Sequence, residues 1–172
     1  WTAGMIPILE DLAVPERQVL AWLQPLDGSL YTPEVFPVFN AYFDEGRYYG
    51  FPVFGIPGFK VGRYHHLEEV IDPDSEIKTV TGEDEAVLRS AVERYFPKAN
   101  GTTMTLKTCM FTNTPDEHFI VDLLPGNTQV AVAAGFSGHG FKFASVIGEI
   151  LADLAITGET EHNIDLLKID RF

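Results

Sequence analysis

A glycine-rich segment between two apolar stretches limits the possible folds of this chain more than any other feature. Its sequence is AAGFSGHGFKF, from Ala133 to Phe143. The residues that lead into it, Gln129 to Ala134, have the composition of a β-strand. After the glycines, apolar residues recur at helical spacing until Gly158, and glycine commonly follows the last turn of a helix. The sequence therefore predicts a strand, a tight turn and a helix, whose apolar stripe consists of Phe143, Val146, Ile147, Ile150, Leu151 and Leu154.

The same turn is suited to bind an anion or a planar ligand. Backbone N–H groups and the positive end of a helix dipole point outward from a turn of this kind. Glycines let a ligand approach the backbone closely, and Lys142 would add a full positive charge. The alternative is a helix entry that needs glycine only for tight packing. The order G-x-x-G-x-G differs from the dinucleotide-binding fingerprint, so the turn alone identifies no ligand.

Strand patterns dominate the part of the chain before this segment. Arg17 to Leu23 is apolar on both alternating faces, which predicts a central strand with both faces covered. Turn residues separate the later runs, which we expect to form antiparallel neighbours. These runs are Val35 to Phe43, Arg47 to Val53 and Phe59 to His65, with further strands at Thr103 to Thr112 and Phe119 to Leu123.

Two helices complete the predicted fold. Thr81 and Asp84 have the spacing of a capping box, and apolar residues then recur at helical spacing until Pro97. We place this helix near Glu83 to Tyr95 and the second near Phe141 to Leu154. The pattern predicts the α+β class, with a mostly antiparallel or mixed sheet flanked by helices.

The composition excludes several classes of partner. The formal net charge of -13 leaves no basic surface for DNA, RNA or anionic lipid. No apolar run reaches the roughly 18 residues that a membrane-spanning helix needs. The single cysteine allows no internal disulfide and suits a reducing compartment, so we expect a cytoplasmic protein. Because the chain opens on Trp1 rather than methionine, we expect it to be a piece of a longer protein.

Lys60 is a candidate functional residue because of its neighbours. Strand alternation places Phe59 and Val61 on one face, and Lys60 on the other with Gly62 and Tyr64. A lysine in such surroundings is either an edge-strand residue whose ammonium reaches solvent or a functional cation in a pocket. The residues alone leave both interpretations open.

The cysteine and three histidines need separate interpretations. Cys109 is either a small buried residue or a reactive thiol, and Lys107 lies on the same predicted strand face. His118 stands between acidic residues and an apolar strand, which favours a hydrogen-bonded structural histidine. His65 and His66 are adjacent, so a strand would direct them to opposite faces and prevent joint metal ligation. We therefore expect no metal site.

Four segments, in their order and spacing, resemble the sarcosine oxidase and N-methyltryptophan oxidase family of FAD-dependent amine oxidases. They are YYGFP (Tyr48 to Pro52), GFKVGRYHH (Gly58 to His66), CMFTNTPDEHFIVD (Cys109 to Asp122) and AAGFSGHGFKF. The resemblance implies that residues 1–172 are the substrate-binding, catalytic part of such an enzyme, with Ala133 to Leu154 packing on the flavin. No G-x-G-x-x-G motif occurs in these residues, so we expect the dinucleotide-binding half to be absent from this chain.

The resemblance also implies residues that hold the cofactor. In the family, the cysteine of the corresponding segment forms a thioether to the 8α-methyl carbon of FAD, and Cys109 takes that place. The glycine-rich turn implies further flavin contacts, from Gly138, His139, Gly140, Phe141 and Lys142.

Catalytic residues follow from the same comparison. Lys60 matches the family's active-site lysine, so the resemblance implies that it activates oxygen. His65 matches the active-site histidine if Arg63 is an inserted residue, whereas an ungapped comparison puts Tyr64 there.

Three substrate-binding residues are implied as well. Tyr49 matches a tyrosine that lines the substrate cavity, and Lys142 matches a lysine that helps hold the substrate carboxylate. Phe111 replaces a tyrosine whose hydroxyl faces the substrate. Because a polar contact discriminates more strongly than apolar bulk, this replacement is expected to change which amines fit.

The implied reaction is oxidation of the C–N bond of N-methyl amino acids such as sarcosine. O2 accepts the electrons, and the products are the amino acid, formaldehyde and hydrogen peroxide. Oxidation of cyclic imino acids such as pipecolate is an alternative. We expect the parent to be monomeric and this part alone to be inactive. Alternatively, this part is a non-catalytic module that associates with itself through an uncovered apolar surface.

Overall fold

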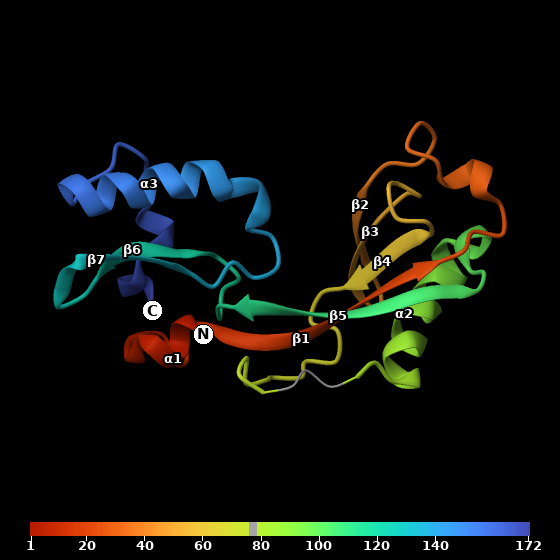
Figure 1. Cartoon of the computed structure of the whole chain (residues 1–172), viewed down its shortest axis with the longest axis horizontal. Coiled ribbons are helices and arrows are strands. Elements are labelled where there is room, and N and C mark those ends of the chain that lie inside the picture. The colour runs from red at the N-terminus through yellow and green to blue at the C-terminus, as the bar shows by residue number, and fades with distance from the viewer. Residues whose placement is uncertain (76–78) are drawn as a thin grey trace. The chain divides into compact units, whose positions relative to one another are not determined.

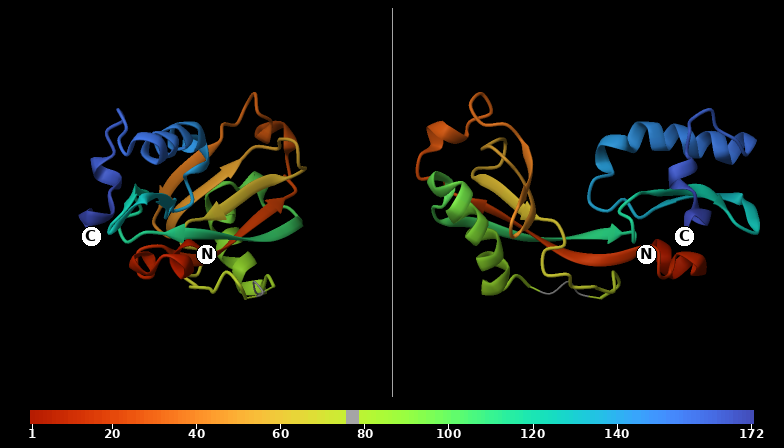
Figure 2. Two further views of the ribbon diagram at one scale, coloured as in Figure 1. Left: turned by 60° about the vertical axis from the view of Figure 1, so that its left-hand side comes forward. Right: turned by 180° about the vertical axis from the view of Figure 1, so that it is seen from behind.

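The computed structural model describes residues 1–75 and 79–172 and divides them into two compact units. One unit, Glu16–Met110, is called here the sheet unit, and the other, Trp1–Pro15 with Phe111–Phe172, the hairpin unit. The boundaries fall within two long strands, β1 (Val14–Leu23) and β5 (Thr103–Asn113). Figures 1 and 2 show both units.

The sheet unit is built on a five-stranded sheet with the order β2-β3-β4-β1-β5. Its other strands are β2 (Phe39–Phe43), β3 (Gly46–Phe51) and β4 (Phe59–Arg63). The pairs β2–β3, β3–β4 and β4–β1 are antiparallel, as the sequence predicts. β1 lies between β4 and β5, which confirms the central strand expected at Arg17 to Leu23.

Helix α2 (Gly82–Tyr95) covers one face of this sheet. It begins with the predicted capping box, because Thr81 accepts from the Asp84 N–H and the Asp84 carboxylate accepts from the Thr81 N–H. The core between helix and sheet is apolar. It contains Val19, Ala21 and Leu23 from β1, Phe59 and Val61 from β4, and Leu88, Ala91 and Val92 from α2.

A buried ion pair joins β1 to the first turn of α2. The Arg17 guanidinium donates to both carboxylate oxygens of Asp84, at 2.7 and 2.8 Å. These hydrogen bonds, together with those from Thr81 and His66, hold the pKa of Asp84 well below its usual range. His66 Nε2 lies 2.9 Å from the same carboxylate, and burial lowers the pKa of His66. His66 thus belongs to a structural network.

The predicted strand at Val35 to Phe43 is wrong in its first half. Residues 32–36 form a turn in which the N–H groups of Val35 and Phe36 both donate to the Thr32 carbonyl. Pro37 has no N–H to add to a sheet ladder, and β2 starts only at Phe39. The predicted strand at Phe59 to His65 also ends earlier, at Arg63, and His65 has a φ of 51°.

The hairpin unit contains the antiparallel strands β6 (Ile120–Leu124) and β7 (Asn127–Ala134) and helix α3 (Ala144–Thr157). Phe119, Val121 and the α3 residues Ile147, Ile150 and Leu154 form one apolar cluster. The other face of the hairpin packs against the short helices α1 (Thr2–Met5) and η1 (Pro7–Leu9) and against the C-terminal segment, in a cluster of Leu9, Ala13, Ile120, Val132, Ala134 and Ile169. Gly158 follows α3 with a φ of 79°, as predicted.

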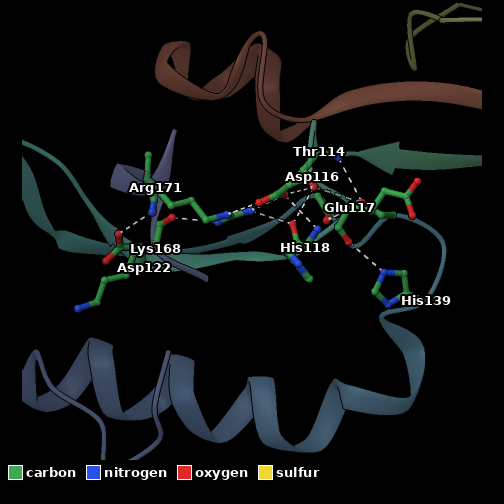
Figure 3. A network of polar contacts seen from close by, with 11 residues as sticks. Thr114, Asp116, Glu117, His118, Asp122, His139, Lys168 and Arg171 are labelled. Carbon is green, nitrogen blue, oxygen red and sulfur yellow. Dashed lines mark hydrogen bonds and ion pairs between the residues drawn. The ribbon is translucent and has the colours of Figure 1, made fainter. Parts of the chain in front are cut away.

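Polar contacts attach the C-terminal segment to the loop before β6 (Figure 3). The Arg171 guanidinium donates to both oxygens of Asp116, at 2.8 and 3.1 Å. Asp116 also accepts from the His118 N–H, and the His118 carbonyl accepts from Thr114 and Arg171. His118 thus contributes backbone hydrogen bonds here, and its side chain is exposed.

The α+β fold with antiparallel strands is confirmed. In the part of the chain that the structure describes, no helix is both long and apolar enough to cross a membrane. Within the same residues, no group of three or more His, Cys, Asp or Glu side chains is arranged to hold a metal ion.

Candidate active site

The side of the five-stranded sheet that faces away from α2 is called here the candidate face. Strand alternation gives it Trp22 from β1, Tyr49 and Phe51 from β3, and Lys60 and Gly62 from β4. The register places Gly62 between Leu20 and Tyr49, and Lys60 between Trp22 and Phe51. The face therefore combines aromatic rings, one ammonium group and one position without a side chain.

Tyr49 occupies the space that Gly62 leaves free. A Cβ added to Gly62 would lie 2.6 Å from the Tyr49 hydroxyl oxygen, closer than atoms can approach. The Tyr64 ring lies edge-on to Tyr49, with centroids 5.1 Å apart. Burial, followed by the charges of Cys109 and Tyr64, raises the pKa of Tyr49 above its usual value. The phenol therefore stays protonated at neutral pH and can donate a hydrogen bond.

Lys60 is partly buried and extends over aromatic rings on both sides. Its Nζ lies 5.1 Å from the Trp22 ring centroid and 5.0 Å from that of Phe51. Both distances are within the range of cation–π attraction. Lys60 is thus a lysine placed on the candidate face, as the alternation predicts.

Cys109 lies on β5, the edge strand next to β1. Its thiol is free and partly buried, and Sγ lies 3.7 Å from the Met110 carbonyl oxygen. The thiol is near enough to Tyr49 for its charge to affect the pKa of that phenol. A partly exposed thiol on an edge strand, near an aromatic residue, fits a covalent tether for a planar group.

His65 and Tyr64 take different positions. His65 follows the end of β4, with a half-exposed ring whose Nδ1 lies 3.2 Å from a carboxylate oxygen of Glu16. The Tyr64 ring is buried, contacts Tyr49, and lies 4.0 Å from the Arg47 guanidinium carbon. Tyr64 therefore packs within the face, while His65 presents an ionisable group beside β1.

The hairpin unit carries the other predicted site residues, in the glycine-rich turn. Gly138 has a φ of 76°, and a Cβ there would lie 2.3 Å from a ring carbon of Phe111. A Cβ on Gly140 would lie 2.4 Å from a ring carbon of Phe136. Both glycines are therefore needed for packing against aromatic rings, which is the structural interpretation of this turn.

The residues after the turn are nevertheless open to a ligand. Phe141 is 96% exposed, and the exposed Lys142 ammonium donates to the His139 carbonyl at 3.2 Å and lies 4.8 Å from the Phe143 ring centroid. The His139 ring is held by the Glu117 carbonyl, 3.0 Å from Nε2. A 3-10 turn, Phe141–Phe143, precedes α3, so the helix starts at Ala144 rather than at the predicted Phe141.

The structure therefore gathers Tyr49, Lys60, His65 and Cys109 in the sheet unit, and Phe111 and Gly138 to Lys142 in the hairpin unit. Trp22, Phe51 and Glu16 are neighbours of these residues that were not predicted from the sequence. Strand alternation can place each on a face. Only the cross-strand register brings Trp22 and Phe51 to Lys60, and no local sequence pattern encodes that register.

Solved structures of other proteins share the fold of this chain. The chain superposes on fructosamine oxidase from Aspergillus fumigatus (Amadoriase II) with a TM-score of 0.72 at 20% identity, covering 94% of this chain and 41% of that one. For fructosyl peptide oxidase from E. terrenum the TM-score is 0.73 at 21% identity, covering 98% and 42%. The chain has the fold of FAD-linked amine oxidases.

Residues 1–154 match the family model "FAD dependent oxidoreductase", and the chain belongs to that family. It is 47% identical over 176 residues to monomeric sarcosine oxidase of Bacillus sp. (strain NS-129) and 34% identical over 179 residues to N-methyl-L-tryptophan oxidase of Escherichia coli (strain K12 / DH10B). These alignments cover 99% and 100% of this chain but 45% of each relative. The resemblance to this family is confirmed, and the chain spans less than half the length of these relatives.

Proposed function

We propose that this chain is the substrate-binding part of an FAD-dependent oxidase of N-methyl amino acids. The reaction converts the substrate, O2 and water into the amino acid, formaldehyde and hydrogen peroxide. One observation carries the proposal: Tyr49, Lys60 and Cys109 lie on strands of one sheet, in a chain 47% identical to a monomeric sarcosine oxidase. We further propose that the whole protein is a cytoplasmic monomer.

Each unit by itself carries residues that the resemblance assigns to the flavin. Cys109 would hold FAD through a thioether, and the segment from Ala133 to Leu154 would pack on it with the exposed Phe141 and Lys142. When bound, FAD supplies the redox chemistry, taking two electrons from the C–N bond and passing them to O2. Lys142 would also attract the substrate carboxylate.

The protein's own groups supply charge and orientation. Negative charge builds up as O2 is reduced, and a fixed ammonium such as that of Lys60 lowers this barrier electrostatically. Tyr49 keeps its proton and can donate a hydrogen bond to a substrate carboxylate. His65, beside Glu16, offers a group that can hold or release a proton near the end of β4.

The test is a peroxide assay of the whole protein with sarcosine, N-methyltryptophan and related secondary amines. We expect peroxide and formaldehyde in equal amounts with at least one of them. Turnover of none of these amines would refute the proposal.

Oxidation of cyclic imino acids such as pipecolate is a second candidate, favoured by one observation. Phe111 offers no hydroxyl, and its ring packs on Gly138. A cavity wall without that hydroxyl accepts a more apolar amine. Arg63, the residue that would be inserted relative to the family, gives no comparable support, because it lies on the strand face opposite Lys60 and donates to the His66 carbonyl. A higher kcat/KM for pipecolate than for sarcosine would establish this alternative.

A non-catalytic role remains a proposal for the chain by itself. Its test is light scattering of the isolated 172 residues: a concentration-dependent rise in mass would support self-association, and a constant monomer mass would exclude it.

A further inference from the structure

We propose that Trp22 and Phe51 are positioning residues that hold the Lys60 ammonium on the candidate face through their aromatic rings, without neutralising its charge. This inference rests on the proposed role of Lys60. It assigns a task to two residues on strands that flank β4.

The first support is the register. Lys60 is paired with Trp22 on β1 and with Phe51 on β3, so both of its cross-strand neighbours are aromatic. Directly paired residues have their Cβ atoms close together on the same face, which is why both rings reach the lysine. The two centroids lie at nearly equal distances from Nζ, 5.1 and 5.0 Å. The ammonium is therefore flanked on two sides.

The second support is the absence of a counter-ion. Among residues 1–75 and 79–172, no carboxylate forms an ion pair with Lys60, whereas Arg17, Arg89, Arg94, Lys168 and Arg171 all pair with acids. A carboxylate would fix the ammonium but cancel most of its field. Aromatic rings attract the cation through their quadrupole and carry no net charge. Lys60 is thus held while its full positive charge stays available to an anion.

The third support is the difference in exposure between the rings. Trp22 is 8% exposed and fixed in the sheet, while Phe51 is 41% exposed. Trp22 therefore gives the ammonium a buried aromatic neighbour, and Phe51 flanks it from a more exposed position. Loss of either ring should let the flexible side chain leave the face, because a lysine has many rotamers to regain.

The direct test is nuclear magnetic resonance of the whole protein labelled with [13C]lysine. Aromatic ring currents should shift the Lys60 ε-CH2 signal upfield, and the Lys60→Met variant identifies that signal by its loss. We expect Trp22→Leu and Phe51→Leu to move the signal towards the ordinary lysine position, and Trp22→Phe to retain most of the shift. Phe51 is half-exposed, so the Phe51→Leu variant should fold. A Lys60 signal that stays in place in this variant would overturn the proposal.

The functional test separates the two half-reactions by stopped flow. We expect Phe51→Leu and Trp22→Leu to slow reoxidation of the reduced flavin by O2 roughly two- to tenfold, and to leave flavin reduction by substrate within about twofold. In a Lys60→Met background neither change should slow reoxidation further. Tyr42→Leu is the matched control, because Tyr42 is an exposed ring over a different cation, Arg47, in the same sheet.

The outcomes distinguish the inference from the proposed function. If Lys60→Met leaves reoxidation unchanged, the oxygen-activating role is wrong, and the lysine signal still shows whether the rings hold the side chain. If Lys60→Met slows reoxidation but both ring variants match Tyr42→Leu, the role stands and the positioning inference is refuted.

Discussion

The phenol ring of Tyr49 lies where a side chain at Gly62, its cross-strand partner, would otherwise stand. A Cβ added at Gly62 would lie 2.5 Å from Cζ of Tyr49 and 2.6 Å from its hydroxyl oxygen. Because Gly62 on β4 has no side chain, the Tyr49 hydroxyl on β3 can occupy this position.

Gly62→Ala should therefore force Tyr49 out of its position. Overpacking of this kind costs about 1–3 kcal/mol of stability, measured as the change in free energy of unfolding in a urea titration. In the whole protein we also expect a raised KM for the amine. Gly82→Ala is the control, because a Cβ there meets nothing within 4 Å at the start of α2. Equal stability of the two variants would contradict this account.

Cys109→Ser tests the proposed flavin tether. Cys109 is the only cysteine of the chain, so it alone in these 172 residues can form a thioether. On acid precipitation of the whole protein, we expect the yellow flavin to stay with the parent polypeptide and to be released from the serine variant. Mass spectrometry should show an increase equal to FAD in the parent alone. Complete release of flavin from the unchanged protein would exclude the covalent link.

Arg17→Leu should destabilise the protein strongly, because it leaves the Asp84 carboxylate buried without its main partner. Arg17 and Asp84 are 2% and 1% exposed, and breaking such a pair costs roughly 3–5 kcal/mol. Arg94→Leu is the matched control: Arg94 is 56% exposed, its partners Asp44 and Glu45 are 85% and 34% exposed, and surface pairs of this kind contribute about 0–1 kcal/mol. Chemical denaturation of both variants checks the contrast, and similar losses would refute it.

Local patterns predicted much of this fold for identifiable reasons. The capping box at Thr81, the helix end at Gly158 and the alternation around Lys60 each depend on residues a few positions apart. Such short-range chemistry is visible in sequence. The prediction of a strand starting at Val35 was wrong because it relied on the apolar pattern and gave too little weight to Pro37. Proline has no N–H to donate to a sheet ladder, and β2 starts after it, at Phe39.

The candidate site was less accessible to sequence reasoning, because its contacts join different strands. Lys60, Cys109 and Tyr49 came from the resemblance to a family, and alternation alone left Lys60 as either a surface lysine or a functional one. The rings of Trp22 and Phe51 are far from Lys60 in sequence and reach it only through the pairing of β1, β4 and β3. In the glycine-rich turn, packing alone accounts for Gly138, because the Phe111 ring leaves no room for a Cβ there.

The Asp116–Arg171 contact predicts a stability that depends on acid pH. Hydrogen bonds from Arg171, the largest influence, lower the pKa of Asp116 to about 2. An Asp in an unfolded chain titrates near pH ~3.9, so the folded protein binds this proton less readily than the unfolded chain does. The stabilisation is therefore fully present above pH ~4 and is lost as the pH falls towards about 2.

Asp116→Asn should lower Tm at neutral pH, and its difference from the parent should shrink over that interval. Asp165→Asn, which removes a carboxylate 79% exposed beside Lys168, is the control and should change Tm little. A Tm difference for Asp116→Asn that stays constant from pH ~6 to ~2 would show that the charge of this carboxylate does not stabilise the C-terminal segment.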